Sequence, residues 1–234
     1  MGTYNDKCKK SIIMNIQENL NHIKSTLPKH VTLVAVTKTK SIDEIMEAYN
    51  AGHRIFGENK IQEMVEKEAQ LPKDIEWHMI GNVQRNKVKH MAPFVNLIHG
   101  VDSLRLLKEI DKQAKRHERT INCLLQIKIA EEDSKFGMSS KDAQDILQSS
   151  EISELKNVCI VGVMGMATFT DDQNQIEEEF KKLKSTFDEL KALNIENCKL
   201  KTISMGMSGD YEMAINCGSN MVRVGSSIFG ERNY

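Results

Sequence analysis

A short run of mostly β-branched, apolar residues followed by an amphipathic segment recurs along this chain. The first run, residues 31–37, is apolar at most positions, which is typical of a parallel strand covered on both faces. Ser41 and Glu44 follow with the spacing of a capping box, in which the two side chains satisfy free N–H groups at a helix start. Apolar side chains then recur at helical spacing as far as Gly52, where we predict the helix end.

The unit repeats eight times, with strands predicted at residues 31–37, 54–57, 75–80, 95–101, 122–129, 158–164, 199–204 and 221–224. The longer predicted helices cover about residues 60–69, 86–92, 140–147 and 173–193, with a further one opening near 103 and a short one at 211–216. Eight such units favour a closed (β/α)8 TIM barrel over an open sheet. We therefore expect residues 1–234 to form one α/β domain, with an extra N-terminal helix at about residues 8–25 that plugs or flanks the barrel.

The bulk properties exclude several classes of protein. A net charge of −1 over 234 residues leaves no basic excess for the phosphates of a nucleic acid, so we expect no nucleic-acid partner. No apolar stretch approaches the roughly 20 residues of a membrane span, and the N-terminus lacks a secretory pattern. The five cysteines are widely spaced without a C-x-x-C pair, so we predict no metal site or disulfide framework. A cytoplasmic location fits, and a mitochondrial one, with a cleaved extension, stays open.

The first strand ends at a lysine that is a candidate nucleophile. In a (β/α)8 barrel the site lies at the C-terminal ends of the strands. Lys38 has the same parity as Val34 and Val36, so one face of the strand delivers it to the barrel mouth. Partial desolvation there favours the neutral amine, which is the form that attacks an aldehyde. The alternative is a lysine whose stem only covers apolar surface at a strand end.

Two glycine-containing loops follow the last two strands and predict a phosphate site. Residues 204–210 (SMGMSGD) end strand seven, and residues 223–227 (RVGSS) end strand eight. Glycines let backbone N–H groups approach an anion, and these two loops are the usual phosphate site of the fold. The alternative is that both are tight turns with Ser or Asp caps.

Several polar residues stand near the same mouth. Arg223 on strand eight points inward and needs an acceptor, such as a pyridine nitrogen or a carboxylate, unless it forms a structural ion pair. Asn59 and His78 offer polar contacts at the mouth, although His78 also fits a core histidine whose hydrogen bonds are satisfied. Lys135 follows strand five as a second lysine near the rim, or as a solvated loop lysine.

Together these segments resemble the pyridoxal phosphate homeostasis protein family, which is related to the barrel domain of fold-type III alanine racemase. The resemblance rests on seven motifs in the family's order: VAVTKTK (34–40), FGEN..QE (56–63), WHMIGNVQRNK (77–87), EDSKFGM (132–138), GMAT (165–168), SMGMSGDYEMAI (204–215) and MVRVGSSIFGERNY (221–234). It spans nearly the whole chain. One departure is Val83, where the family commonly has leucine, and this change conserves volume.

The resemblance implies a cofactor and its contacts. Lys38 would hold pyridoxal 5′-phosphate (PLP) as an imine, Ser208, Gly225 and Ser226 would help to bind the phosphate, and Arg223 would face the pyridine nitrogen. The other cofactor-binding positions that it implies are Asn59 near the ring, Met207 lining the phosphate loop, and the motif positions His78, Met166 and Ser204. Such proteins carry and buffer PLP inside cells, and apo-forms of PLP enzymes are their expected partners.

An enzyme is the alternative, above all an amino-acid racemase. Two-base racemisation needs a second acid/base group, which in fold-type III racemases is a tyrosine from a separate domain of a partner subunit. We expect this chain to lack that domain, and a guanidinium at Arg223 does not release its proton to the ring. We therefore expect a cofactor carrier without robust turnover, acting as a monomer. A barrel for another sugar or nucleotide phosphate would leave Lys38 unexplained.

Overall fold

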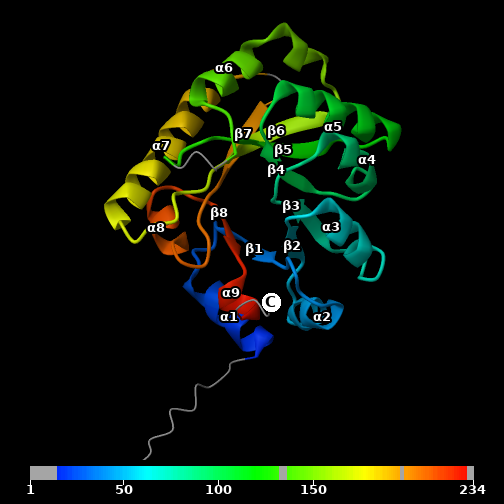
Figure 1. The fold of residues 1–234 in the computed structure, drawn as a ribbon, viewed down its shortest axis with the longest axis vertical. Coiled ribbons are helices and arrows are strands. Elements are labelled where there is room, and N and C mark those ends of the chain that lie inside the picture. The colour runs from blue at the N-terminus through cyan, green and yellow to red at the C-terminus, as the bar shows by residue number, and fades with distance from the viewer. Residues whose placement is uncertain (1–14, 132–135, 196–197, 231–234) are drawn as a thin grey trace, which may run out of the picture.

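A computed structural model describes residues 15–131, 136–195 and 198–230 of this protein. Eight parallel strands in these residues form a closed barrel in the order β1 to β8, which confirms the predicted fold (Figure 1). The strands are β1 (Thr32–Val36), β2 (Ile55–Glu58), β3 (Glu76–Met79), β4 (Leu97–Val101), β5 (Ile121–Gln126), β6 (Val158–Met164), β7 (Cys198–Ser204) and β8 (Met221–Val224).

Helices surround the barrel, and the long helix α7 runs along one side of it (Figure 1). The helices of the described residues are α1 (Ile16–Thr26), α2 (Ile42–Asn50), α3 (Ile61–Glu68), α4 (Val88–Met91), α5 (Leu104–Arg116), α6 (Ser140–Gln148), α7 (Gln173–Ala192), α8 (Tyr211–Asn216) and α9 (Ser226–Phe229), with 3-10 turns η1 (Arg85–Lys87) and η2 (Ser150–Glu154). None of these helices is long and apolar enough to cross a bilayer.

Local sequence signals explain several element ends. The capping box at α2 is present, with Ser41 and Glu44 each satisfying a backbone N–H of the other. Gly52 takes a φ of 82° after that helix, as predicted. Helix α1 has its own capping box, formed by Asn15 before the helix and Glu18 in its first turn, and the helix contacts α2 and α9. It therefore flanks the barrel, and the part predicted at residues 8–14 lies outside the described residues.

Two strand boundaries differ from the prediction by two residues or more. Strand β5 ends at Gln126 rather than at residue 129, and Ile127 instead forms an isolated bridge with Met138. In this bridge the N–H of Met138 donates to the carbonyl of Gln126, and the N–H of Lys128 donates to the carbonyl of Met138. Strand β4 begins at Leu97 rather than at residue 95, because the N–H of Val95 still donates to the carbonyl of Met91 at the end of α4.

The buried apolar side chains form two separate layers. The larger layer fills the space between the sheet and the helices, with Phe56, Trp77 and Phe180 among its largest members. The smaller layer fills the barrel interior and includes Val34 and Val36 of β1. The inward parity predicted for the first strand is therefore confirmed, and the next residue of that parity is Lys38.

Candidate functional site

A cavity of about 590 Å³ opens at the barrel mouth, within the usual range for a small-molecule site. Eight of the residues predicted for the site line it: Lys38, Asn59, Met166, Met207, Ser208, Arg223, Gly225 and Ser226. Gln126 and Lys40 also line it, and so do Phe136 and Phe169, the large apolar side chains most exposed in the described residues. Closure of the barrel thus brings together residues that are up to 188 positions apart, from Lys38 to Ser226.

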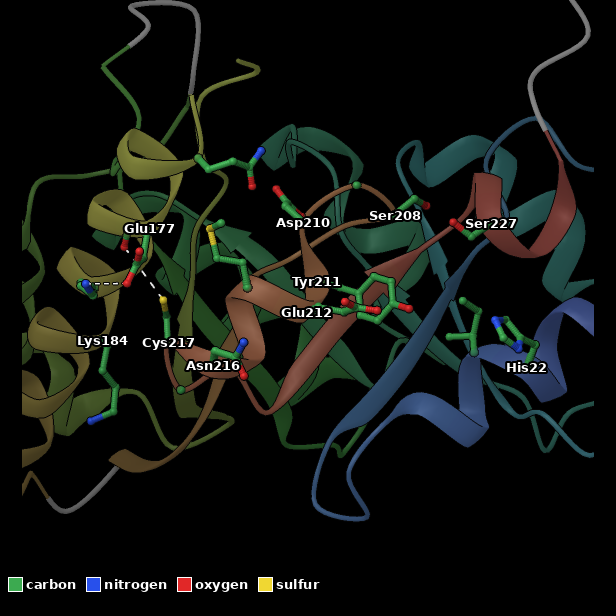
Figure 2. Close-up of a pocket in the computed structure, with 16 residues that line it drawn as sticks. His22, Glu177, Lys184, Ser208, Asp210, Tyr211, Glu212, Asn216, Cys217 and Ser227 are labelled. Carbon is green, nitrogen blue, oxygen red and sulfur yellow. Dashed lines mark hydrogen bonds and ion pairs between the residues drawn. The ribbon is translucent and has the colours of Figure 1, made fainter. Parts of the chain in front are cut away.

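A larger hollow of about 1120 Å³ lies on the outer side of the loop at residues 208–210, between α1, α7 and α8 (Figure 2). Its walls are surface side chains of these helices, such as His22, Glu177 and Tyr211. Of the residues predicted for the site, only Ser208 borders it. The smaller cavity inside the mouth is therefore the candidate site, because the amine, the guanidinium and both loops meet there.

Lys38 lies in a tight turn directly after β1. The N–H of Lys40 donates to the carbonyl of Thr37 at 3.0 Å and closes this turn. Lys38 is half-buried on the cavity wall. The second lysine of the cavity is Lys40, whose amine donates to the carbonyl of Phe229 at 2.8 Å and lies 3.2 Å from the Glu44 carboxylate.

The loops after β7 and β8 are joined to each other at the cavity wall. The N–H of Gly225 donates to the Ser208 hydroxyl at 3.3 Å, and the Asp210 carboxylate accepts from the N–H of Met207 at 2.5 Å. Gly206 has a φ of 96°, and a Cβ there would lie 2.7 Å from the Cβ of Ala214. Hydroxyl and backbone N–H groups are donors that suit a phosphate, and the first N–H groups of a helix such as α9 have no partner within the helix.

Arg223 is held on the cavity wall by uncharged oxygens. Its Nη1 donates to the carbonyl of Ser204 at 2.8 Å and to the Ser204 hydroxyl at 2.6 Å, and its Nη2 donates to the carbonyl of Gly165 at 3.0 Å. Burial lowers the pKa of Arg223 to about 10, against the opposing effect of Asp210. The guanidinium therefore stays charged at neutral pH and can only donate hydrogen bonds.

Two of the predicted site residues lie beneath the cavity rather than on its wall. His78 is 4% exposed and Ser204 is fully buried. The alternative role of His78 as a core histidine matches its surroundings, because one ring nitrogen lies 3.1 Å from a nitrogen of His99. Ser204 bonds both Arg223 and His99, the latter at 3.1 Å. The alternation of side chains along a strand shows which residues face inward, but it does not show whether they lie at the mouth or in the layer beneath it.

The directions of these hydrogen bonds follow from Arg223. Because a guanidinium only donates, the Ser204 hydroxyl accepts from it and can give its own hydrogen to Nδ1 of His99. His99 then carries its proton on Nε2 and donates to Nδ1 of His78. Burial lowers the pKa of His78 to about 3 and that of His99 well below its usual range, so both rings are neutral. Each hydrogen bond in the series from Arg223 through Ser204 and His99 to His78 therefore has one donor and one acceptor.

Sequence reasoning missed His99 and Gln126. His99 shares its parity on β4 with Leu97, which faces the barrel interior, so the alternation along that strand could have found it. Gln126 ends β5 at the cavity and donates to the carbonyl of Phe136 at 3.0 Å. Lys135 lies outside the described residues.

This fold and this mouth define a barrel of the alanine racemase type. Residues 13–233 match the family model described as the alanine racemase N-terminal domain. A solved alanine racemase from Clostridium difficile has the same fold, with a TM-score of 0.75, 16% identity, and coverage of 94% of this chain but 56% of that one. Relatives named pyridoxal phosphate homeostasis protein are 34–39% identical over 86–95% of this chain, so the chain belongs to that family.

Relatives of that name resemble the chain over most of its length. The pyridoxal phosphate homeostasis protein of Pasteurella multocida is 37% identical, covering 95% of this chain and 97% of its own. The Escherichia coli protein of that name is 34% identical and covers 88% of each chain. PipY of Synechococcus elongatus, solved with PLP bound, has a TM-score of 0.84 and 33% identity, covering 92% of this chain and 100% of its own.

Proposed function

We propose that this protein binds PLP at the barrel mouth and acts in the intracellular homeostasis of that cofactor, by carrying and buffering it. The observation that carries the proposal is the meeting of three chemistries in one cavity. Lys38 supplies an amine, the joined loops at Ser208 and Gly225 supply donors for an anion, and Arg223 supplies a charged donor. The named relatives and the PLP-bound PipY structure support the same function.

The donor set fits the three reactive parts of PLP. The Lys38 amine would hold the aldehyde carbon through a C=N bond, formed with loss of one water. The hydroxyls of Ser208 and Ser226 would donate to phosphate oxygens, with the N–H of Gly225 holding the Ser208 hydroxyl in place, and Arg223 would donate to the pyridine nitrogen. When bound, PLP supplies an electrophilic imine carbon conjugated to its ring. Asn59, Met166 and Met207 complete the wall around the ring.

Carriage rather than racemisation fits this cavity better. A two-base racemase needs a second acid/base group on the far face of the cofactor. Tyr49 and Tyr211 are the tyrosines within the described residues, and neither lines the cavity. Transfer to apo-forms of PLP enzymes, a monomeric state and a cytoplasmic location belong to the same proposal.

The test is an absorption spectrum with PLP, before and after borohydride, followed by peptide mapping. We expect an imine band that bleaches and leaves a reduced pyridoxyl group on Lys38. Lys38→Ala should lose the band, and Lys40→Ala is the matched control, because Lys40 lines the same cavity and should leave the label in place. Label on Lys40, or an unchanged band in Lys38→Ala, would overturn the assignment.

A second assay separates carriage from catalysis. The PLP-loaded protein is incubated with L-alanine, and loss of optical activity is followed by circular dichroism. We expect no turnover above that of free PLP at the same concentration. Turnover that disappears in Lys38→Ala would instead make the protein a racemase.

A further inference from the structure

A cluster of three charged side chains, two of them buried and the third partly exposed, lies behind the turn that carries Lys38. Glu58 ends β2 and is fully buried, and Lys67 on α3 is 6% exposed. The Lys67 amine lies 2.7 Å from Glu58 and 2.7 Å from Glu63, one turn earlier on α3. We call these three residues the acid–lysine cluster. Glu58 and Glu63 belong to the FGEN..QE motif, and neither lines the cavity.

The acid–lysine cluster holds the residues on both sides of Lys38. On one side, the Thr37 hydroxyl donates to Glu58 at 2.6 Å, and the carbonyl of Thr37 accepts from Lys67 at 2.7 Å. On the other side, the N–H of Thr39 donates to the Glu63 carboxylate at 2.6 Å. The backbone of Lys38 is thus fixed before and after its own Cα by one network.

The hydrogen bond to Glu63 holds Thr39 in a backbone conformation that threonine disfavours. Thr39 has a φ of 64°, a region that β-branched residues rarely adopt. Such a conformation persists where surrounding contacts over-determine it, and it gathers at functional sites. Without the bond to Glu63, the turn would relax toward negative φ and carry Lys38 with it.

Stability alone does not account for these buried charges. Burial raises the pKa of Glu58, although Lys67 opposes the shift. Its second carboxylate oxygen has no hydrogen-bond partner among the described residues. Buried ion pairs often contribute little net stability, because desolvation offsets their attraction. The role of the acid–lysine cluster is therefore better explained by the residues that it holds in place.

We propose that Glu58, Lys67 and Glu63 are positioning residues that fix the turn from Thr37 to Lys40, so that the Lys38 amine stays in reach of an aldehyde in the cavity. This inference rests on the proposed function, because it assigns the cluster to imine formation at Lys38. It predicts that loosening the turn weakens the covalent part of PLP binding and leaves the phosphate part unchanged.

The test compares two ligands on matched variants. PLP forms an imine, whereas pyridoxine 5′-phosphate has the same phosphate and ring but no aldehyde. Glu63→Leu removes the acceptor of Thr39, and Glu63→Gln keeps an oxygen there as the conservative rescue. Glu66→Leu is the control, because Glu66 is an exposed position on the same helix. Dissociation constants are measured by fluorescence titration, and the imine by absorbance.

We expect Glu63→Leu to bind PLP at least tenfold more weakly and to form imine more slowly, with pyridoxine 5′-phosphate affinity unchanged within twofold. Glu63→Gln should recover most of the PLP affinity, and Glu66→Leu should match the unsubstituted protein. Equal losses for both ligands, or no loss for either, would overturn the positioning role. Should Glu63→Leu fail to fold, Glu63→Ala removes the same acceptor and answers the same question.

The two proposals fail in different ways. If the unsubstituted protein forms no imine on Lys38, the proposed function falls and the positioning role falls with it. If that imine forms and Glu63→Leu binds both ligands like the unsubstituted protein, only the positioning role falls.

Discussion

The neutral histidine pair beneath the cavity makes a quantitative prediction about acid stability. His78 and His99 have depressed pKa values in the folded protein, with His78 at about 3. In the unfolded chain each titrates near its ordinary pKa of about 6.5. Below that pH the unfolded state binds protons that the folded state does not, so the free energy of unfolding falls as pH falls.

The size of this effect follows from the pKa difference. A pH of 5 lies about 1.5 units below the pKa of each histidine in the unfolded chain. Each of these units lowers the free energy of unfolding by roughly 1.4 kcal/mol per histidine. Each histidine therefore lowers the free energy of unfolding by about 2 kcal/mol relative to neutral pH, and the pair by about 4 kcal/mol. The loss from His78 continues as pH falls to about 3.

Urea unfolding at several pH values between 5 and 8 measures this slope. His99→Asn should lower stability at every pH, because it breaks the chain between His78 and Ser204. In this variant, the free energy of unfolding should change less steeply with pH between pH 5 and 5.5. The slope should fall by roughly 1.4 kcal/mol per pH unit, which corresponds to about one proton fewer taken up on unfolding. An unchanged slope would mean that His99 takes up a proton in the folded state, and the hydrogen-bond directions derived from Arg223 would be wrong.

Three further substitutions test other parts of the structure. Gly206→Ala should lower the free energy of unfolding by at least about 2 kcal/mol in urea titrations, because its φ of 96° is strained for alanine and the new Cβ meets Ala214; wild-type stability would contradict the tight loop. Ser41→Ala should cost about 1 kcal/mol of the same quantity through loss of the α2 cap, with no change in PLP affinity. Ser208→Ala should weaken binding of both PLP and pyridoxine 5′-phosphate about fivefold, for loss of one hydrogen bond of about 1 kcal/mol, and a loss confined to PLP would place Ser208 away from the phosphate.

The barrel was predictable because its signals are local. Runs of β-branched residues, the capping box at Ser41 and the turn at Gly52 each act over a few residues, and all were found where expected. The boundary of β5 was less predictable, because the apolar run continues past Gln126 as a single bridge to Met138. Nothing local distinguishes that bridge from one more strand residue.

The sequence by itself determined the barrel, the place of Lys38 and the two loops at Ser208 and Gly225, because strand parity and loop composition are properties of short segments. Only the tertiary structure decided which inward polar side chains reach the cavity and which lie beneath it. His78 meets His99, and Glu58 meets Lys67, across neighbouring elements whose relative height is fixed by barrel closure. That height depends on contacts around the whole sheet, so no single segment encodes it.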